Sequence, residues 1–200
     1  MLRSFGLEKK ASASPRRTAP DADVALVSRV VAGDLLAFEA LYRIYYPRLD
    51  RFLSLMTARR TVVEEALNDT MHVVWRRSAT YNQQCKVSTW IFAIAYRTAL
   101  KALRSQDEPV ESGSDDELLS EEAGPEQQMM AGQARSTVLR ALDALSAEQR
   151  SVLVLTYFHD LPYAEIARIV DCPVDTVKTR VFHGRRRLRA MLQGGPEGPS

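Results

Sequence analysis

The sequence predicts an all-α protein in which two small helical domains are joined by a flexible acidic linker. Apolar residues recur at helical spacing on both sides of residues 107–134, and no strand-rich segment is present. Residues 107–126 contain acidic side chains but neither Lys nor Arg, a composition that favours disorder. Residues 161–192 have the pattern of two short helices joined by a tight turn, which predicts a helix-turn-helix within a four-helix C-terminal domain.

The chain begins with a predicted disordered basic tail over residues 1–21, where Lys and Arg are mixed with Ala, Ser and Pro without amphipathic periodicity. The N-terminal domain is expected over residues 22–106. Its first helical segment covers residues 24–46, and an apolar stripe runs through and beyond this segment. The stripe consists of Leu41, Tyr45, Leu49, Phe52 and Leu53.

Further along this domain, aromatic and basic residues are interleaved over residues 81–104. Proteins hold single-stranded DNA with this combination, because bases stack on the rings while cations follow the backbone. Trp90 shares a helical stripe with Ile94, so core packing is the favoured alternative for Trp90. The interleaved residues are Tyr81, Trp90, Phe92 and Tyr96 with Lys86, Arg97, Lys101 and Arg104.

The predicted linker, residues 107–134, is rich in Gly, Pro, Ser and carboxylates that repel one another. A flexible chain of about 28 residues spans about 30 Å on average and at most about 100 Å when fully extended. One turn of DNA is about 34 Å, so the two domains can reach sites one or two turns apart on one duplex. The linker can equally be a mere spacer, or its charge can keep it off DNA or let it mimic nucleic acid in a basic channel.

The C-terminal domain is expected over residues 135–193, followed by a Gly- and Pro-containing tail at 194–200. Ser146 is a predicted N-cap with Gln149 as its capping-box partner, splitting two amphipathic segments. The helix-turn-helix follows. Its first helix is predicted from four residues at helical spacing: Tyr163, Ile166, Ala167 and Val170. Asp171 to Pro173 end this helix, and Thr176 is the predicted N-cap of the second helix. The apolar stripe of the second helix consists of Val177, Val181, Leu188 and Leu192.

The second helix of this motif is strongly basic on the side away from its apolar stripe. No acidic residue occurs from Lys178 to Arg189, although an ordinary exposed helix would interleave glutamates for pairing. A solvated surface helix is therefore the less favoured alternative. Side chains in the first turns could reach base edges in a major groove, and the later arginines suit phosphate.

These segments resemble bacterial sigma factors of the extracytoplasmic-function (ECF), sigma-70-related family. The run LSAEQR, VLVLTYF and YAEIARIVDCPVDTVKTRVFHGRRRLRAML resembles the promoter-reading C-terminal domain of that family. In the N-terminal domain, the segment around GD and AFEALY resembles its opening helices. Residues 63–75 resemble its polymerase-clamping helix, and residues 88–104 its promoter-melting helix. The resemblance covers most of residues 22–193.

The resemblance implies a protein that binds core RNA polymerase, directs promoter-specific transcription initiation and helps melt the promoter, without enzymatic activity or a cofactor. It assigns residues to three contacts. The minus-thirty-five set is Thr176, Lys178, Thr179, Arg180, Phe182, His183, Arg185, Arg186 and Arg187. The minus-ten set is Tyr81, Asn82, Gln83, Gln84, Lys86, Trp90, Tyr96, Arg97, Lys101 and Arg104. The core-polymerase set is Glu65, Leu67, Asn68, Asp69, Thr70, Met71, Val74 and Trp75.

Some residues depart from the family pattern. Arg97 stands where Asn is common, which favours a phosphate contact over fine hydrogen bonding and alters the expected minus-ten preference. Pro162 replaces the usual Ser cap but suits a first helical turn. His183 and Gly184 replace Arg and Ala, which is expected to weaken one DNA contact and soften the helix. On the helix expected to bind polymerase, the side chains of Glu65, Asn68 and Asp69 differ in length from those that the family usually has at these positions.

The sequence and its family resemblance also predict the partners and the cellular location of the protein. Because no apolar segment reaches the length of a signal or membrane-spanning helix, we expect a cytoplasmic protein without direct membrane insertion. The resemblance implies an anti-sigma factor, with promoter DNA bound both as duplex and as melted non-template strand. A disulfide between Cys85 and Cys172 is not expected, since they fall in different domains. The three histidines lie at no metal-ligand spacing with these cysteines.

Two other classes of protein compete with this interpretation. A helix-turn-helix transcription regulator would bind duplex DNA independently of polymerase, but it leaves residues 63–104 unexplained. An enzyme acting on DNA would need a nucleophile or clustered carboxylates with a metal ion. The acidic residues of this chain cluster in the predicted flexible linker, which disfavours that class.

Overall fold

The computed structural model describes residues 20–107 and 138–193, and every regular element within these two ranges is helical. This confirms the all-α prediction; the proposed linker and tails fall almost wholly outside the described ranges. The N-terminal half contains α1 (Pro20–Val31), α2 (Leu35–Met56), α3 (Arg60–Arg77), the 3₁₀ turn η1 (Ser78–Thr80) and α4 (Val87–Asp107). The C-terminal half has helical residues at 138–143, followed by α6 (Ala147–Tyr157), α7 (Tyr163–Val170) and α8 (Val174–Gln193).

The first helix begins earlier than the sequence suggested. α1 starts at Pro20 and so includes the last two residues of the predicted disordered tail. Proline suits this position because the first turn of a helix has no use for its backbone N–H. A tight turn then leads into α2, in which Gly33 adopts a φ of +84° and the Asp34 carboxylate accepts hydrogen bonds from the N–H groups of Leu36 and Ala37.

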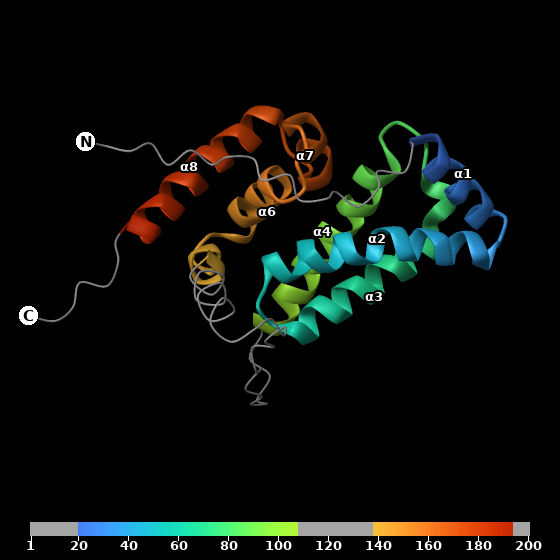
Figure 1. Ribbon diagram of the computed structural model, residues 1–200, viewed down its shortest axis with the longest axis horizontal. Helices are drawn as coiled ribbons and strands as arrows, with labels where there is room; N and C mark the ends of the chain where they lie inside the picture. Colours follow the sequence, from blue (N-terminus) through green and yellow to red (C-terminus); the bar gives the residue numbers. More distant parts are fainter. Residues whose placement is uncertain (1–19, 108–137, 194–200) are drawn as a thin grey trace, which may run out of the picture.

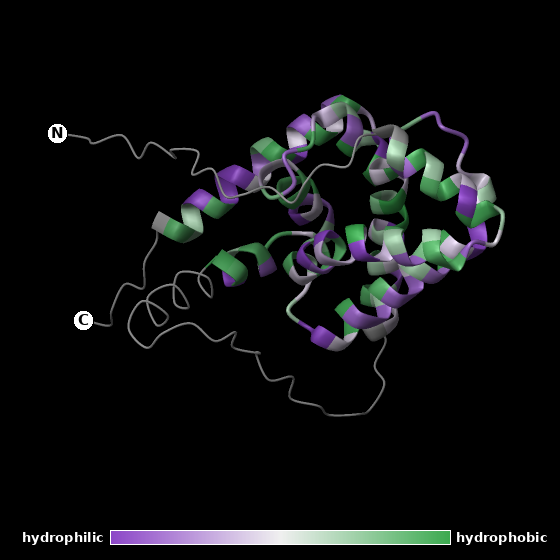
Figure 2. Cartoon of the chain, turned by 45° about the vertical axis from the view of Figure 1, so that its right-hand side comes forward, coloured by the Kyte–Doolittle hydropathy of each residue, from purple (hydrophilic) through white to green (hydrophobic). Residues whose placement is uncertain are grey.

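The core of the N-terminal half lies between α2, α3 and α4, whose apolar faces pack together (Figure 1). The apolar stripe predicted on α2 is buried throughout, and α4 contributes Ile91 and Phe92 to the same core. Figure 2 shows hydrophilic and hydrophobic residues alternating along these helices, which is the amphipathic pattern that places one face inward.

In the C-terminal half, α6, α7 and α8 pack around buried side chains that include Leu153, Ile166 and Val177. The Ser146 hydroxyl accepts a hydrogen bond from the Gln149 N–H at 3.3 Å, which confirms Ser146 as the N-cap of α6. Asp171 adopts a left-handed φ of 52° and ends α7.

The two halves pack directly against each other, which the sequence did not predict. α7 lies against α4, and α6 lies against α2 (Figure 1). The His159 ring, just beyond α6, sits 4.9 Å from the Phe92 ring and 6.0 Å from the Phe52 ring. Within the described residues, one continuous hydrophobic core therefore includes side chains from both halves.

Candidate nucleic-acid interface

The basic helix α8 presents the first candidate surface. Val177 and Val181 are buried against the rest of the C-terminal half, as their stripe predicts, whereas Leu192 at the far end is 49% exposed. The prediction of a core position for Leu192 is wrong, because α8 extends beyond its neighbours (Figure 1). The prediction that Thr176 caps the helix is also wrong, because α8 begins at Val174, directly after Pro173.

The outward side of α8 carries polar, aromatic and cationic groups close together. Phe182 is 62% exposed, and its ring lies 5.3 Å from the His183 ring. The Lys178 ammonium is 2.9 Å from the Asp175 carboxylate, and the Thr179 hydroxyl donates to the Asp175 carbonyl. Both contacts are local to the first turns of α8 and lie on the exposed surface.

The arginines of α8 divide into two groups. Arg180 is half-buried, and its Nη1 lies 3.7 Å from Cys172 Sγ in the turn between α7 and α8, so it packs against its own motif. The later arginines are exposed, and within the described residues they form no ion pair. Unpaired cations on one helix attract a polyanion such as DNA. The arginines of this second group are Arg185, Arg186, Arg187 and Arg189, of which the first three were predicted as DNA contacts.

The second candidate surface is the loop of residues 81–86 before α4. Its backbone is held by local hydrogen bonds: the Tyr81 hydroxyl donates to the Cys85 carbonyl at 2.7 Å, and the Asn82 side chain accepts from the Gln84 N–H. Gln83 adopts a left-handed φ of 59°. The side chains of Asn82, Gln83 and Gln84 are all exposed, so their amides are available to a ligand.

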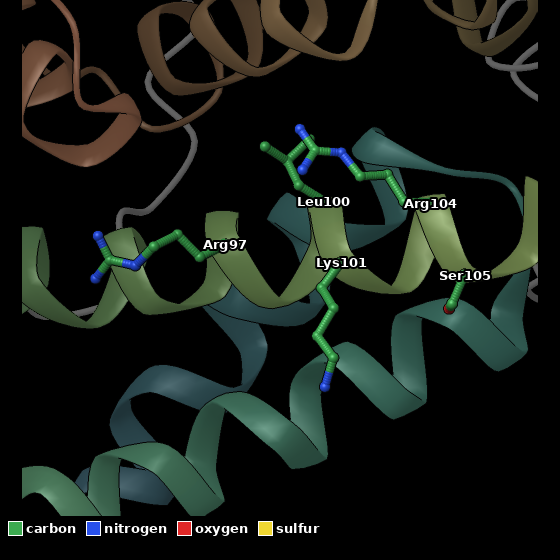
Figure 3. A pocket seen from close by; sticks show the side chains of 5 residues that line it. All are labelled: Arg97, Leu100, Lys101, Arg104 and Ser105. Atoms are coloured by element: carbon green, nitrogen blue, oxygen red, sulfur yellow. The ribbon is translucent and has the colours of Figure 1, made fainter.

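Further along α4, in its C-terminal half, the exposed side of the helix is cationic. Arg97, Lys101 and Arg104 line an open pocket of about 520 Å³ with Leu100 and Ser105. Figure 3 shows Leu100 and Arg104 extending from one side of α4 and Lys101 from the other, so the cations surround the helix rather than converging on one point. Such a surface suits an extended backbone of phosphates better than a small ligand.

Two of the aromatic residues predicted to contact the minus-ten strand, both on α4, differ in their exposure. The Trp90 ring packs 5.4 Å from the Tyr81 ring and is partly buried against the core, which agrees with the packing alternative, while its contact with DNA stays a prediction. Tyr96 is 6% exposed and lies beside Ser151 of α6. Burial raises the pKa of the Tyr96 phenol above its usual value. Tyr96 is therefore inaccessible to DNA in this arrangement.

The third candidate surface, the outer face of α3, is narrower than the sequence predicted. Half of the residues assigned to it belong to the core instead, because their helix face packs against α2 and α4. The Thr70 hydroxyl, for example, lies 2.8 Å from the Thr98 hydroxyl of α4. Glu65 and Asn68 are exposed, and Asp69 and Trp75 are half-buried. The buried residues that are corrected here are Leu67, Thr70, Met71 and Val74.

Sequence reasoning missed two residues of α7 that contact the loop before α4. Glu165 forms an ion pair with Lys86, and Arg168 Nη1 donates to the Gln84 carbonyl at 3.1 Å. Neither residue carries a signal in the sequence, because each is an ordinary charged residue of an amphipathic helix. In the described ranges, no cluster of His, Cys, Asp and Glu could hold a metal ion, and no helix is long and apolar enough to cross a membrane.

The fold and these surfaces define a class: a helical DNA-binding protein with a helix-turn-helix and a second helical unit. The family models match both units, namely sigma-70 region 2 over residues 41–108 and sigma-70 region 4 over residues 135–188. Together these matches cover more than half of the chain. The protein belongs to the sigma-70 family and is an ECF sigma factor with a role in transcription initiation.

Similar proteins support this assignment over nearly the whole chain. The ECF RNA polymerase sigma-E factors of Salmonella typhimurium and Escherichia coli are each 28% identical over 181 residues, which is 86% of this chain and 94% of theirs. The sigma-E factor of Haemophilus influenzae is 26% identical over 184 residues, with 86% of this chain and 95% of its own covered.

Two solved structures share the fold. CnrH, in complex with the cytosolic domain of CnrY, gives a TM-score of 0.66 at 20% identity, covering 88% of this chain and 100% of that chain. RpoE of Bartonella quintana, in complex with the anti-sigma factor NepR, gives a TM-score of 0.61 at 22% identity, covering 80% of this chain and 98% of that chain.

Proposed function

We propose that this protein binds core RNA polymerase, directs it to promoters and helps to open them. The observation that carries this proposal is the exposed cationic side of α8, which follows a helix-turn-helix turn in a chain that also contains a sigma-70 region 2. A regulator that acts without polymerase would have no use for region 2. We propose no catalytic role, and we place the protein in the cytoplasm, where polymerase acts.

In this proposal, α8 reads the minus-thirty-five element as duplex DNA. Lys178, Thr179, Phe182 and His183 are exposed on its first turns and would face base edges in the major groove. The later arginines would contact phosphates and set the register of the helix on the duplex. Arg180 would act mainly through the turn that it supports, because its guanidinium packs on Cys172.

The minus-ten element would be held as a single strand by α4 and the loop before it. The exposed amides of Asn82, Gln83 and Gln84 have the donors and acceptors needed to read the edge of an unstacked base. Lys101 and Arg104 would follow the phosphates of the same strand. Arg97 would join them, since a guanidinium favours phosphate.

We propose that core polymerase docks on the exposed rim of α3. Glu65, Asn68, Asp69 and Trp75 retain exposed surface there, whereas the buried residues of α3 support the helix from behind. A mixed surface of charged, amide and aromatic groups suits a partner helix lying in a groove. The anchor of this contact would be Trp75, whose ring packs 5.1 Å from the Phe38 ring of α2.

An anti-sigma factor is the proposed inhibitory partner. Both solved structures described above are complexes, and the partner of RpoE is named as an anti-sigma factor. Affinity purification of the full-length protein from native extract should recover such a partner at a constant ratio. Recovery of polymerase subunits alone from uninduced cells would count against this part of the proposal.

The decisive experiment is reconstitution with core RNA polymerase that lacks any sigma subunit, followed by run-off transcription on a library of genomic fragments. We expect a stable complex that initiates at fragments sharing two upstream motifs. A protein that ignores polymerase yet binds duplex DNA would instead be a transcription regulator, and the assignment of α3 and α4 would be wrong.

A further inference from the structure

We propose that Tyr81 and Asn82 are positioning residues that hold the loop of residues 81–86 in a fixed shape, and that Gln83 is the residue of this loop that reads an unstacked base. This inference rests on the proposed function, because it assigns separate roles to residues of the surface that would hold the minus-ten strand. It is carried by the hydrogen bonds and the backbone conformation of the loop.

Tyr81 closes the loop. Its hydroxyl donates to the Cys85 carbonyl at 2.7 Å. The Tyr81 ring lies 5.4 Å from the Trp90 ring of α4, and both rings pack against the hydrophobic core. A phenol that is held both at its ring and at its hydroxyl has little freedom to stack on a base. We therefore assign Tyr81 a supporting role in place of the DNA contact that the sequence pattern predicts.

Asn82 fixes the turn inside this closed loop. Its side-chain oxygen accepts a hydrogen bond from the Gln84 N–H at 3.2 Å, so the side chain takes the place of a backbone carbonyl in the turn. An amide oxygen that is occupied in this way is less available to the edge of a base. The bonds of Tyr81 and Asn82 both join residues of the same loop, so neither depends on the contacts that α7 makes with it.

Gln83 lies at the apex of the turn that Asn82 bridges. Its φ of 59° falls in the left-handed region, which is unfavourable for a residue with a Cβ and persists where surrounding contacts hold the backbone. Gln83 is exposed, and of the three amide residues of the loop it alone takes no part in a hydrogen bond with the described residues. Its side chain therefore keeps both its donors and its acceptor for a base.

A loop that is closed before binding favours both affinity and selectivity. A loop that becomes ordered only on binding loses conformational entropy at that step, and this loss weakens binding. The bonds of Tyr81 and Asn82 reduce that loss. They also keep the Gln83 amide in one position, as the narrow geometry of a hydrogen bond to a base edge requires. Base selectivity should therefore depend on Tyr81 and Asn82, although neither of them contacts the base.

Selection of promoter variants tests the role of Gln83. Each protein is combined with core polymerase and with a fragment, recovered by run-off transcription, in which the minus-ten element is randomised; fragments retained in open complexes are sequenced. Gln83→Gly accepts the left-handed φ and removes the amide, so we expect the preference for one base to fall about tenfold. The matched control is Gln84→Ala, which removes another exposed amide of the loop. A preference that survives Gln83→Gly, or that the control loses to the same extent, would overturn the proposal.

Conservative substitutions separate positioning from direct contact. Asn82→Ala removes the oxygen that fixes the turn and should lower the same preference about fivefold. Asn82→Asp keeps this oxygen but lacks the amide donors, so it should restore the preference. The added charge cancels, because the measured quantity is a ratio among bases on otherwise identical DNA. Tyr81→Phe, which loses only the hydroxyl, should behave like Asn82→Ala. Failure of Asn82→Asp to restore the preference would show that Asn82 contacts the base and would overturn the proposal.

Hydrogen exchange followed by NMR tests the loop in the free protein, without polymerase. The Gln84 N–H should exchange about fivefold faster in Asn82→Ala than in the wild-type protein, because it loses its hydrogen bond. Equal exchange in the two proteins would overturn the proposal even if transcription were normal. Failure of the wild-type protein to bind polymerase, with the difference in exchange intact, would instead refute the proposed function, on which the role of Gln83 depends. Circular dichroism checks that the helices of each variant are intact.

Discussion

Tyr45 shows how a single polar group joins two helices inside an apolar core. Its hydroxyl donates to the Asp23 carboxylate at 2.6 Å, and both residues are buried. Burial, followed by this hydrogen bond, raises the pKa of the Tyr45 phenol far above its usual value. The bond ties α1 to α2 at a point where an unpaired carboxylate would be costly.

We expect Tyr45→Phe to lower the free energy of unfolding by about 1–3 kcal/mol, because it leaves a buried Asp23 oxygen without its donor. The measurement is urea unfolding followed by circular dichroism. Tyr46→Phe is the matched control, since it removes a hydroxyl from a half-buried ring of the same helix. Equal unfolding midpoints for the two variants would contradict this account.

Gly184 has a packing role that its place in the sequence did not reveal. A Cβ at this position would lie 2.8 Å from Cδ1 of Leu153, a side chain of α6 that is only 2% exposed. Its low helix propensity predicts a softer α8, and this stays a prediction. The structure adds that the missing side chain allows α8 to approach α6 closely.

Gly184→Ala sets two effects against each other. Alanine favours the helix by about 1 kcal/mol, but overpacking a buried contact costs about 1–3 kcal/mol. Because Leu153 is enclosed, we expect a net loss of about 1 kcal/mol in the free energy of unfolding. A double-mutant cycle with Leu153→Ala should show a coupling between the two sites, and simple additivity would argue against a clash.

At the scale of elements, α8 combines a structural side and a binding side in one helix. Buried valines anchor it to α6 and α7, while the arginines beyond Gly184 point to solvent. α3 likewise divides into a buried face and an exposed rim. Both helices are predicted by the sequence pattern, but fewer residues of α3 lie on the outside than that pattern predicts.

Arg186→Ala tests the binding side of α8. If Arg186 contacts a phosphate, the variant should bind duplex DNA more weakly, and the slope of log K against log salt should fall by about 0.9. Fluorescence anisotropy at several salt concentrations measures both quantities. Arg43→Ala, an exposed arginine of α2 that pairs with Glu39, should leave the slope unchanged. An unchanged slope for Arg186→Ala would show that Arg186 does not contact a phosphate.

At the scale of the whole molecule, the junction between the halves contains a titratable group. His159 packs between Phe52 and Phe92, and burial, aided by the charges of Arg48 and Arg51, lowers its pKa from 6.5 to about 4. The neutral ring is therefore favoured in the folded protein. The unfolded chain binds the proton more tightly, so acid favours loss of the packed junction.

We expect this group to contribute its full stability above pH 6.5 and to lose that contribution as the pH falls towards about 4. By about pH 5 the loss would be on the order of 2 kcal/mol. Urea unfolding at neutral pH and near pH 5 measures the difference. His159→Leu should show a smaller acid effect than the wild-type protein. An identical acid effect in both proteins would show that other groups control it.

Local sequence patterns were enough to predict the helices and to place many residues of the candidate site. The apolar stripe of α2, the cap at Ser146 and the break before α8 each depend on neighbours within a few residues, so they could be read directly. Positions that depend on distant packing were predicted less well. Tyr96 and Met71 carry no local signal that distinguishes a surface residue from one covered by another helix.

The sequence by itself determined that this protein is helical, that its C-terminal half contains a helix-turn-helix, and that it resembles ECF sigma factors. Helical periodicity, capping residues and charge runs are local properties, so they can be recognised from the sequence alone. Only the tertiary structure decided which side of α4 is covered and that Glu165 pairs with Lys86. These two residues are 79 positions apart, and such contacts depend on the packing of whole helices rather than on local pattern.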